Sequence, residues 1–108
     1  IFDATAGANH PHSVAILGGL ASVLLKAGRI AEAETYYRRA VETGTAVLPS
    51  DHPSLALVQL GLAGVAADQG RCEEASDLRN QYLPILEVAG QGERPDIRLT
   101  VAAIEACR

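Results

Sequence analysis

The sequence repeats with a period of 42 residues, and this period constrains the fold more than any other feature. His10-Pro11 recurs as His52-Pro53, and Pro95 stands at the same phase a third time. Between His10 and Val41, ten of 32 positions are identical to the residue one period later, where chance would give about two. A fixed period of this size predicts a solenoid, in which each unit buries its apolar face against its neighbours.

Each repeat is predicted to form two helices. Apolar residues from Val14 to Leu25 recur at three- and four-residue spacing, which places them on one helical face and leads us to expect a buried Leu20-Ala21 pair. Gly28 and Gly70 are predicted to end the first helix of each pair, because a helix end often needs a left-handed residue. The five predicted helices span about 11–27, 30–44, 53–69, 72–88 and 95–108.

These helices predict an all-α fold, a right-handed α-solenoid of antiparallel helix pairs with about two and a half repeats. We assign 1–9 to the end of a preceding linker or repeat, 10–51 to the first repeat, 52–94 to the second and 95–108 to a terminal capping helix. The segment 44–51 is expected to be fraying helix and linker. Pro84 is expected to kink its helix or end it early, because proline removes a backbone hydrogen bond.

A known repeat family shows the same local pattern. The segment from Gly28 to Ala40, GRIAEAETYYRRA, resembles the GRYEEAExLYxRAL segment of tetratricopeptide repeats. With the His-Pro opening and the 42-residue period, the chain is similar to the kinesin-light-chain type of these repeats from about His10 onward. The resemblance is weaker in the second repeat, where Arg79 stands in place of the aromatic Tyr37 and Tyr82 in place of the small Ala40. It implies a repeat protein that binds other proteins.

The resemblance also implies that the first helix of each pair lines a concave groove. In the transport proteins of this type, an Asn commonly precedes the Leu-Ala pair and holds the backbone of an extended peptide, whereas this chain has Gly19 and Gly61 there. We predict a mostly small and apolar groove formed by Ala15, Gly18, Gly19, Ser22, Leu25, Lys26, Leu57, Leu60, Gly61, Gly64, Ala67 and Asp68, with Leu99, Ala102, Ala103 and Ala106 from the fifth helix. In the alternative interpretation, the glycines only allow tight helix packing and a neighbouring segment of the protein fills the groove.

The fifth predicted helix carries charge where the others carry alanine. Glu105 falls at the phase of Ala21 and Ala63, where a buried unpaired carboxylate would be costly. Arg98, Glu105 and Arg108 form one stripe, as expected for a solvated outer face. We interpret this helix as a terminal cap; the alternative is a degenerate repeat whose second helix lies outside this sequence.

Cys72 and Cys107 are the two cysteines. They stand at the start of one predicted helix and the end of an antiparallel one, so they can lie close together. We expect two free thiols that behave as small buried hydrophobes. The alternative, a disulfide, requires an oxidising compartment.

Charge and motif spacing argue against several functions. The net charge is −4 and Arg38-Arg39 is the only adjacent basic pair, so we expect no nucleic-acid binding. No apolar run approaches the ~20 residues of a membrane span. We interpret His10, His12 and His52 as helix-start residues, because no ligand spacing accompanies them. We expect no catalytic residues, metal or cofactor, and a cytoplasmic location.

The function predicted from the sequence is a protein–protein interaction module that binds a partner peptide or protein around Leu25, Leu57, Leu60 and Gly61. The alternative is a structural solenoid spacer or a self-association segment within a larger regulatory or scaffold protein.

Overall fold

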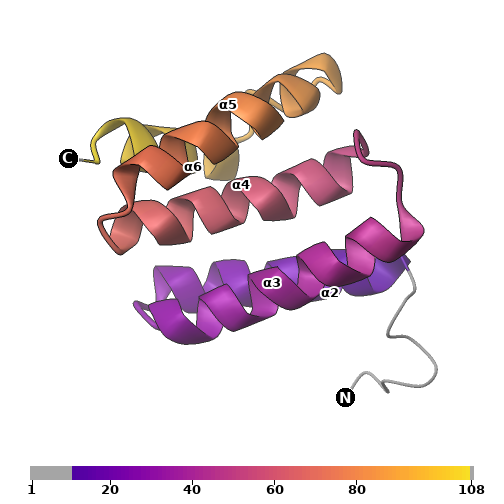
Figure 1. Cartoon of the computed structure of the whole chain (residues 1–108), viewed down its shortest axis with the longest axis horizontal. Helices are drawn as coiled ribbons and strands as arrows, with labels where there is room; N and C mark the ends of the chain where they lie inside the picture. Colours follow the sequence, from indigo (N-terminus) through magenta and orange to yellow (C-terminus); the bar gives the residue numbers. More distant parts are fainter. Residues whose placement is uncertain (1–10, 108) are drawn as a thin grey trace.

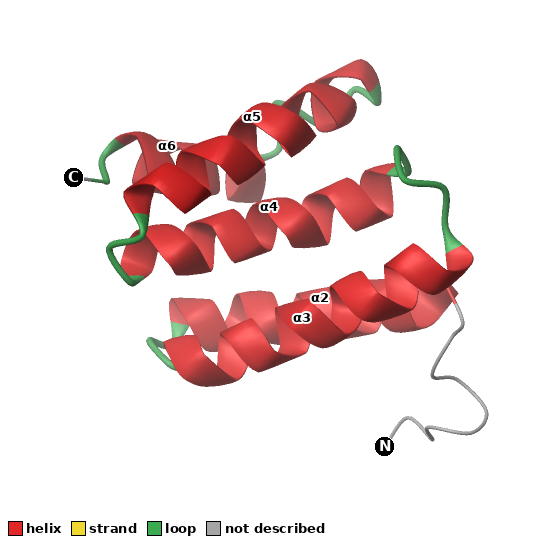
Figure 2. Cartoon of the chain, in the orientation of Figure 1, coloured by secondary structure: helices red, strands yellow, loops and turns green. Residues whose placement is uncertain are grey.

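The computed structural model describes residues 11–107, which form five helices and no strand (Figure 2). The helices are α2 (Pro11–Lys26), α3 (Ile30–Val47), α4 (Pro53–Asp68), α5 (Cys72–Val88) and α6 (Pro95–Glu105). This architecture confirms the predicted all-α solenoid of helix pairs. The predictions for residues 1–9, for His10 as a helix start and for Arg108 lie outside the described residues.

The helices pack as two antiparallel pairs followed by a single helix. The chain reverses between α2 and α3 and again between α4 and α5, while α4 lies between the first pair and α5 (Figure 1). The helix α6 packs against both α4 and α5. Each new first helix therefore rests on the pair before it, as in a solenoid.

Two glycines give the repeats the same internal turn. Gly28 and Gly70 have φ angles of 82° and 79°, in the left-handed region that favours glycine. The N–H of Arg29 then donates to the carbonyl of Leu24 at 2.9 Å, and the N–H of Arg71 donates to that of Ala66 at 2.8 Å. These bonds satisfy carbonyls at each helix end, so the turns follow from the predicted glycine positions.

The start of α4 has a side-chain cap. His52 is the capping residue, and its Nδ1 accepts a hydrogen bond from the N–H of Ser54 at 3.0 Å. Pro53 follows in the first turn, where its missing N–H costs nothing. His52 is thus a helix-start residue, as interpreted from the sequence.

Two predicted helix ends differ from the structure, and the alternative in which Pro84 ends its helix early is wrong. The helix α3 continues through Gly44 to Val47. Gly44 is buried where a Cβ would lie 2.8 Å from Cδ1 of Leu55, so this glycine permits close packing and does not end the helix. The helix α5 continues past Pro84 to Val88 rather than ending early. Pro84 is exposed, so water can replace the hydrogen bond that it removes. The helix α6 ends at Glu105, before the predicted 108.

Two apolar clusters form the core. The first joins α2 and α3 to one face of α4, and includes Val14, Ala21, Ala33, Tyr37, Ala40, Leu55, Val58 and Val65. The second joins the other side of α4 to α5 and α6, and includes Ala56, Leu60, Ala63, Ala66, Ala75, Leu86, Ile97 and Ile104. The small alanines permit close helix approach. The prediction of a buried Leu20-Ala21 pair is half wrong, since Ala21 is buried but Leu20 is 47% exposed.

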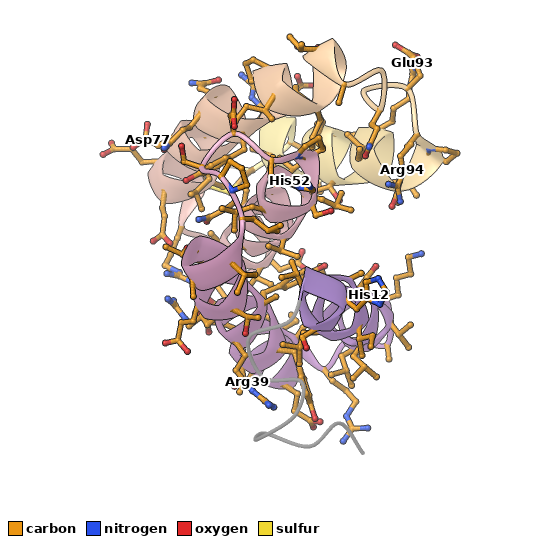
Figure 3. All side chains as sticks on the ribbon, turned by 90° about the vertical axis from the view of Figure 1, so that its right-hand side faces the viewer. His12, Arg39, His52, Asp77, Glu93 and Arg94 are labelled. Atoms are coloured by element: carbon orange, nitrogen blue, oxygen red, sulfur yellow. A yellow bond between two sulfur atoms is a disulfide. The ribbon has the colours of Figure 1, made fainter. Side chains whose placement is uncertain are left out.

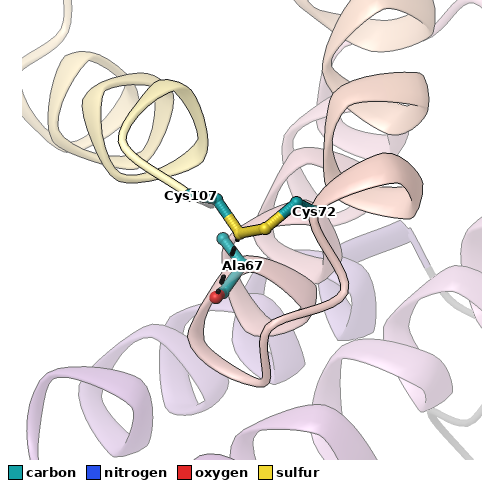
Figure 4. Close-up of a disulfide and its surroundings, with 3 residues drawn as sticks. All are labelled: Ala67, Cys72 and Cys107. Carbon is teal, nitrogen blue, oxygen red and sulfur yellow. Dashed lines mark hydrogen bonds between the residues drawn. A yellow bond between two sulfur atoms is a disulfide. The ribbon is translucent and has the colours of Figure 1, made fainter.

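A disulfide joins Cys72 at the start of α5 to Cys107 just after α6 (Figure 4). The two Cα atoms are 5.5 Å apart, within the usual range for a disulfide. The Sγ of Cys107 also lies 3.6 Å from the carbonyl oxygen of Ala67. The expectation of two free thiols is therefore wrong: the packing of α6 on the second helix pair brings the residues within bonding distance.

Candidate functional site

A cavity lies on the concave side, between α2, α4 and α6. Its volume is about 690 Å³, within the range of sites that hold small molecules or peptide side chains. The first helix of each pair lines it, and Tyr37 of α3 together with the loop before α6 completes the wall. Figure 3 shows Arg94 on the side where α2 faces α6, with Asp77 of α5 on the opposite side of the molecule.

The structure brings the predicted groove residues into this cavity. Among the lining residues are Ala15, Gly18, Gly19, Ser22, Leu25, Lys26, Leu57, Leu60, Gly61, Gly64 and Asp68. The helix α6 adds Leu99 and Ala103, as expected. The other three expected contributors, Ala67, Ala102 and Ala106, are not part of the lining.

The lining residues differ in accessibility. Leu60, Gly61 and Gly64 are buried and form the floor, and Leu60 is also part of the second core cluster. Leu57 is half-buried and Leu99 is 67% exposed. A ligand would therefore contact Leu57 and Leu99, while Leu60 mainly supports the fold.

The groove glycines have two different roles. A Cβ on Gly61 would lie 2.2 Å from Cε1 of Tyr37, and one on Gly18 would lie 2.8 Å from Cγ1 of Val58. These two positions need glycine for helix packing, as the alternative interpretation holds. A Cβ on Gly19 would meet nothing within 4 Å, so this glycine leaves open space in the groove.

Tyr37 is a groove residue that the sequence analysis missed. Its ring covers Gly61, and it is a buried residue of the first cluster. Burial raises the pKa of the Tyr37 hydroxyl above its ordinary value of 10.0; the Ser22 side chain opposes this shift and the Asp96 carboxylate adds to it. The hydroxyl thus stays protonated at neutral pH and is able to donate a hydrogen bond. Tyr37 stands on the second helix of its pair, and the helical spacing of that helix does not indicate a groove residue.

The rim near α6 is polar. The Nη2 of Arg94 lies 2.8 Å from Oδ2 of Asp96, and Nη1 of Arg94 donates to the side chain of Gln91 at 3.3 Å. Asp96 Oδ1 also accepts from the N–H of Ile97 at 2.9 Å. Lys26 and Asp68 add exposed charges of opposite sign elsewhere on the lining. Small apolar residues with a few charges suit binding of a polypeptide.

Neither metal ligation nor membrane insertion emerges from the described residues. Over 11–107, histidines, cysteines and carboxylates nowhere gather in the threes that could hold a metal ion. Within the same residues, no helix combines the length and apolarity needed to cross a bilayer. The features that characterise the site are the shape of its cavity and the packing of the helices that line it.

A helical repeat array with a concave surface is the class of protein that this fold defines. The family model described as tetratricopeptide repeat matches residues 2–87, and the chain belongs to that family. Tetratricopeptide repeats generally mediate protein–protein interactions and are generally non-enzymatic. No curated protein and no solved structure matches the chain.

Proposed function

We propose that this chain binds an extended segment of a partner protein in the groove between α2, α4 and α6. The observation that carries the proposal is that one cavity runs across three successive first helices and is lined mainly by small and apolar residues. The open space at Gly19 lets a backbone approach α2, while Leu57 and Leu99 offer apolar contact to side chains. Binding rather than catalysis is the activity of this site.

The test uses two groove leucines together. Leu57→Glu with Leu99→Glu places charge in the cavity without touching Leu60, whose burial makes it unsuitable because a carboxylate there would unfold the core. Val88→Glu is the matched control, since Val88 of α5 is 90% exposed and outside the lining. Affinity capture from a lysate of the source cells compares wild type, double variant and control after circular dichroism shows equal helicity.

We expect a partner that wild type and Val88→Glu retain and the double variant loses. Equal capture by all three chains, or capture by none, would contradict groove binding. That result would favour the structural alternative of a spacer or self-association segment.

Three finer predictions belong to this proposal. The kinesin-light-chain type is supported by the 42-residue period and the recurring His-Pro pair. The absence of nucleic-acid and membrane partners stays a prediction, supported by a net charge of −4. The cytoplasmic location also stays a prediction, and the Cys72–Cys107 disulfide weighs against it because disulfides persist mainly in oxidising compartments.

A further inference from the structure

The helix α2 carries an exposed apolar stripe outside the groove. Ile16 is 42% exposed, Leu20 47% and Val23 66%, and all three are absent from the cavity lining. Their spacing of four and three residues places them on one helical face. Single exposed hydrophobic residues are common on protein surfaces, but three large aliphatic side chains in one row form a contiguous patch, which is typical of an interaction site.

The same stripe one repeat later is an interface. Val58, Leu62 and Val65 stand 42 residues after the members of the stripe. Val58 is 3% exposed and Val65 0%, and both belong to the cluster that joins α4 to α2 and α3. Leu62 packs against that cluster. In α4, this phase of the repeat therefore contacts the preceding helix pair.

A second period later, the stripe again faces the preceding pair. Thr100, Ile104 and Cys107 occupy the three positions on and just after α6. Ile104 is buried in the cluster shared with α4 and α5, and Cys107 is bonded to Cys72 at the start of α5. Two of the three equivalent stripes are thus covered by the pair before them, and the α2 stripe is the remaining one.

We propose that the α2 stripe docks a further helix pair of this same repeat type, supplied by polypeptide upstream of Ile1. The α2 stripe continues, one period earlier, the interface that the chain already forms between its own repeats.

A second copy of the chain fits this face less well. Val58 and Val65 are covered by the side of the α2–α3 pair that faces the next repeat, and α4 already occupies that side. The corresponding side of α4 and α5 is occupied by α6. Among the described helices, no pair has this side free to cover the stripe of another molecule.

The test adds a helix pair ahead of α2, at the spacing of the natural repeat. In an extended chain, residues 10–51 are duplicated ahead of His10, so that Asp51 of the copy joins His10 as Asp51 joins His52 in the native chain. Val23→Cys in the downstream copy reports coverage through its rate of alkylation under non-reducing conditions, which keep the native disulfide closed. Val88→Cys serves as the exposed control. The same two labels are then placed in the 108-residue chain and in the complete natural gene product.

We expect alkylation of Val23→Cys to slow about tenfold or more in the extended chain and in the gene product, relative to the 108-residue chain, while Val88→Cys reacts equally in all three. An unchanged Val23→Cys rate in either longer chain would overturn the proposal. Protection already present in the 108-residue chain would overturn it too: concentration-independent protection would assign the stripe to residues 1–10, and protection that grows with concentration to a second copy. None of these outcomes depends on whether the groove binds a partner.

Discussion

Two interfaces between successive repeats can be compared directly, because one period of 42 residues relates them. In the first, Ile30 of α3 packs against the cluster that contains Val65 of α4. In the second, Cys72 and Cys107 stand one period later and are joined by a disulfide. The same two positions of the repeat thus make an apolar contact in the first interface and a disulfide bond in the second.

One position on the second helix of each pair changes from aromatic to charged between the two interfaces. Tyr37 covers Gly61 in the first interface, and its counterpart one period later is Arg79. The Nη1 of Arg79 lies 2.8 Å from Oε2 of Glu105, the residue at the phase of Ala63. Glu105 is exposed and paired, so the charge that distinguishes α6 is solvated as the sequence indicated.

The difference follows from what flanks each interface. The helix α4 is packed by α3 on one side and by α5 on the other, whereas α6 is the one described first helix with no second helix following it within residues 11–107. A helix of 11 residues that packs on one side buries less apolar surface. The disulfide and the Arg79–Glu105 ion pair add to the apolar packing that holds α6 on the second helix pair.

The largest predicted effect comes from opening the disulfide. Cys72→Ser with Cys107→Ser should lower the free energy of unfolding by about 2–4 kcal/mol, because the crosslink no longer restricts the unfolded chain. Urea unfolding followed by circular dichroism measures this loss. Cys72→Ile with Cys107→Val, which installs the apolar pair of the first interface, should recover part of it. Equal stability of the serine variant and wild type would show that packing alone holds α6.

The next effect tests the apolar interface. Gly61→Ala should lower the free energy of unfolding by about 1–3 kcal/mol, since its methyl group would overlap the ring of Tyr37 and force a helix shift. Gly19→Ala is the control with open space, and should be neutral or stabilising by up to ~1 kcal/mol through helix propensity. Chemical denaturation of both variants gives the comparison. A neutral Gly61→Ala would mean that Tyr37 moves aside freely.

The Arg79–Glu105 ion pair should contribute less to stability than the disulfide or the Gly61–Tyr37 contact. Arg79 and Glu105 have side chains 28% and 59% exposed, so water screens their attraction. A double-mutant cycle with Arg79→Ala and Glu105→Ala should give a coupling energy of about 0.2–1 kcal/mol that falls as salt is added. A coupling that does not respond to salt would indicate packing by the arginine stem instead.

The 42-residue period, together with the glycines that follow helices and the prolines that begin them, accounts for most of what could be predicted. Gly28 and Gly70 stand at the same phase and follow the first helix of each pair, so local rules predicted the pairs and their order. The groove could be predicted because the family resemblance implies that the first helices line it, and helical spacing then gives the face of each helix. Tyr37 could not, since it reaches the floor from a second helix through a gap that exists only because Gly61 lacks a side chain.

The disulfide and the accessibility of Leu20 depended on tertiary structure. Cysteine spacing alone does not distinguish a bonded pair from two buried thiols, and the distance between them depends on how α6 packs. The position of Leu20 in its helix matches that of Leu62, but Leu62 packs against the α2–α3 pair, whereas no described helix pair precedes α2. Periodicity identifies the face, but the neighbours decide its burial.

The smallest effect concerns a carboxylate specific to the first interface. Glu34 of α3 lies 2.6 Å from Nη2 of Arg38 and 3.3 Å from Nη2 of Arg71, and its counterpart one period later is Ser76. The hydrogen bond from Arg38 holds the pKa of Glu34 below its ordinary value of 4.5, against the opposing effect of burial, with Gln69 and Arg71 assisting.

Because the folded pKa is lowered, the stabilisation by Glu34 is complete above the unfolded value and is lost as pH falls through the folded one. Glu34→Gln should therefore cost a few tenths of a kcal/mol at pH 7, and the two chains should converge in stability as the pH falls through the folded pKa. Urea unfolding across a pH series measures the difference, and Ser76→Glu with Asn80→Arg, at the counterparts of Glu34 and Arg38, tests whether the second interface gains the same dependence. A gap between wild type and Glu34→Gln that persists at low pH would show that Glu34 acts through packing rather than through charge.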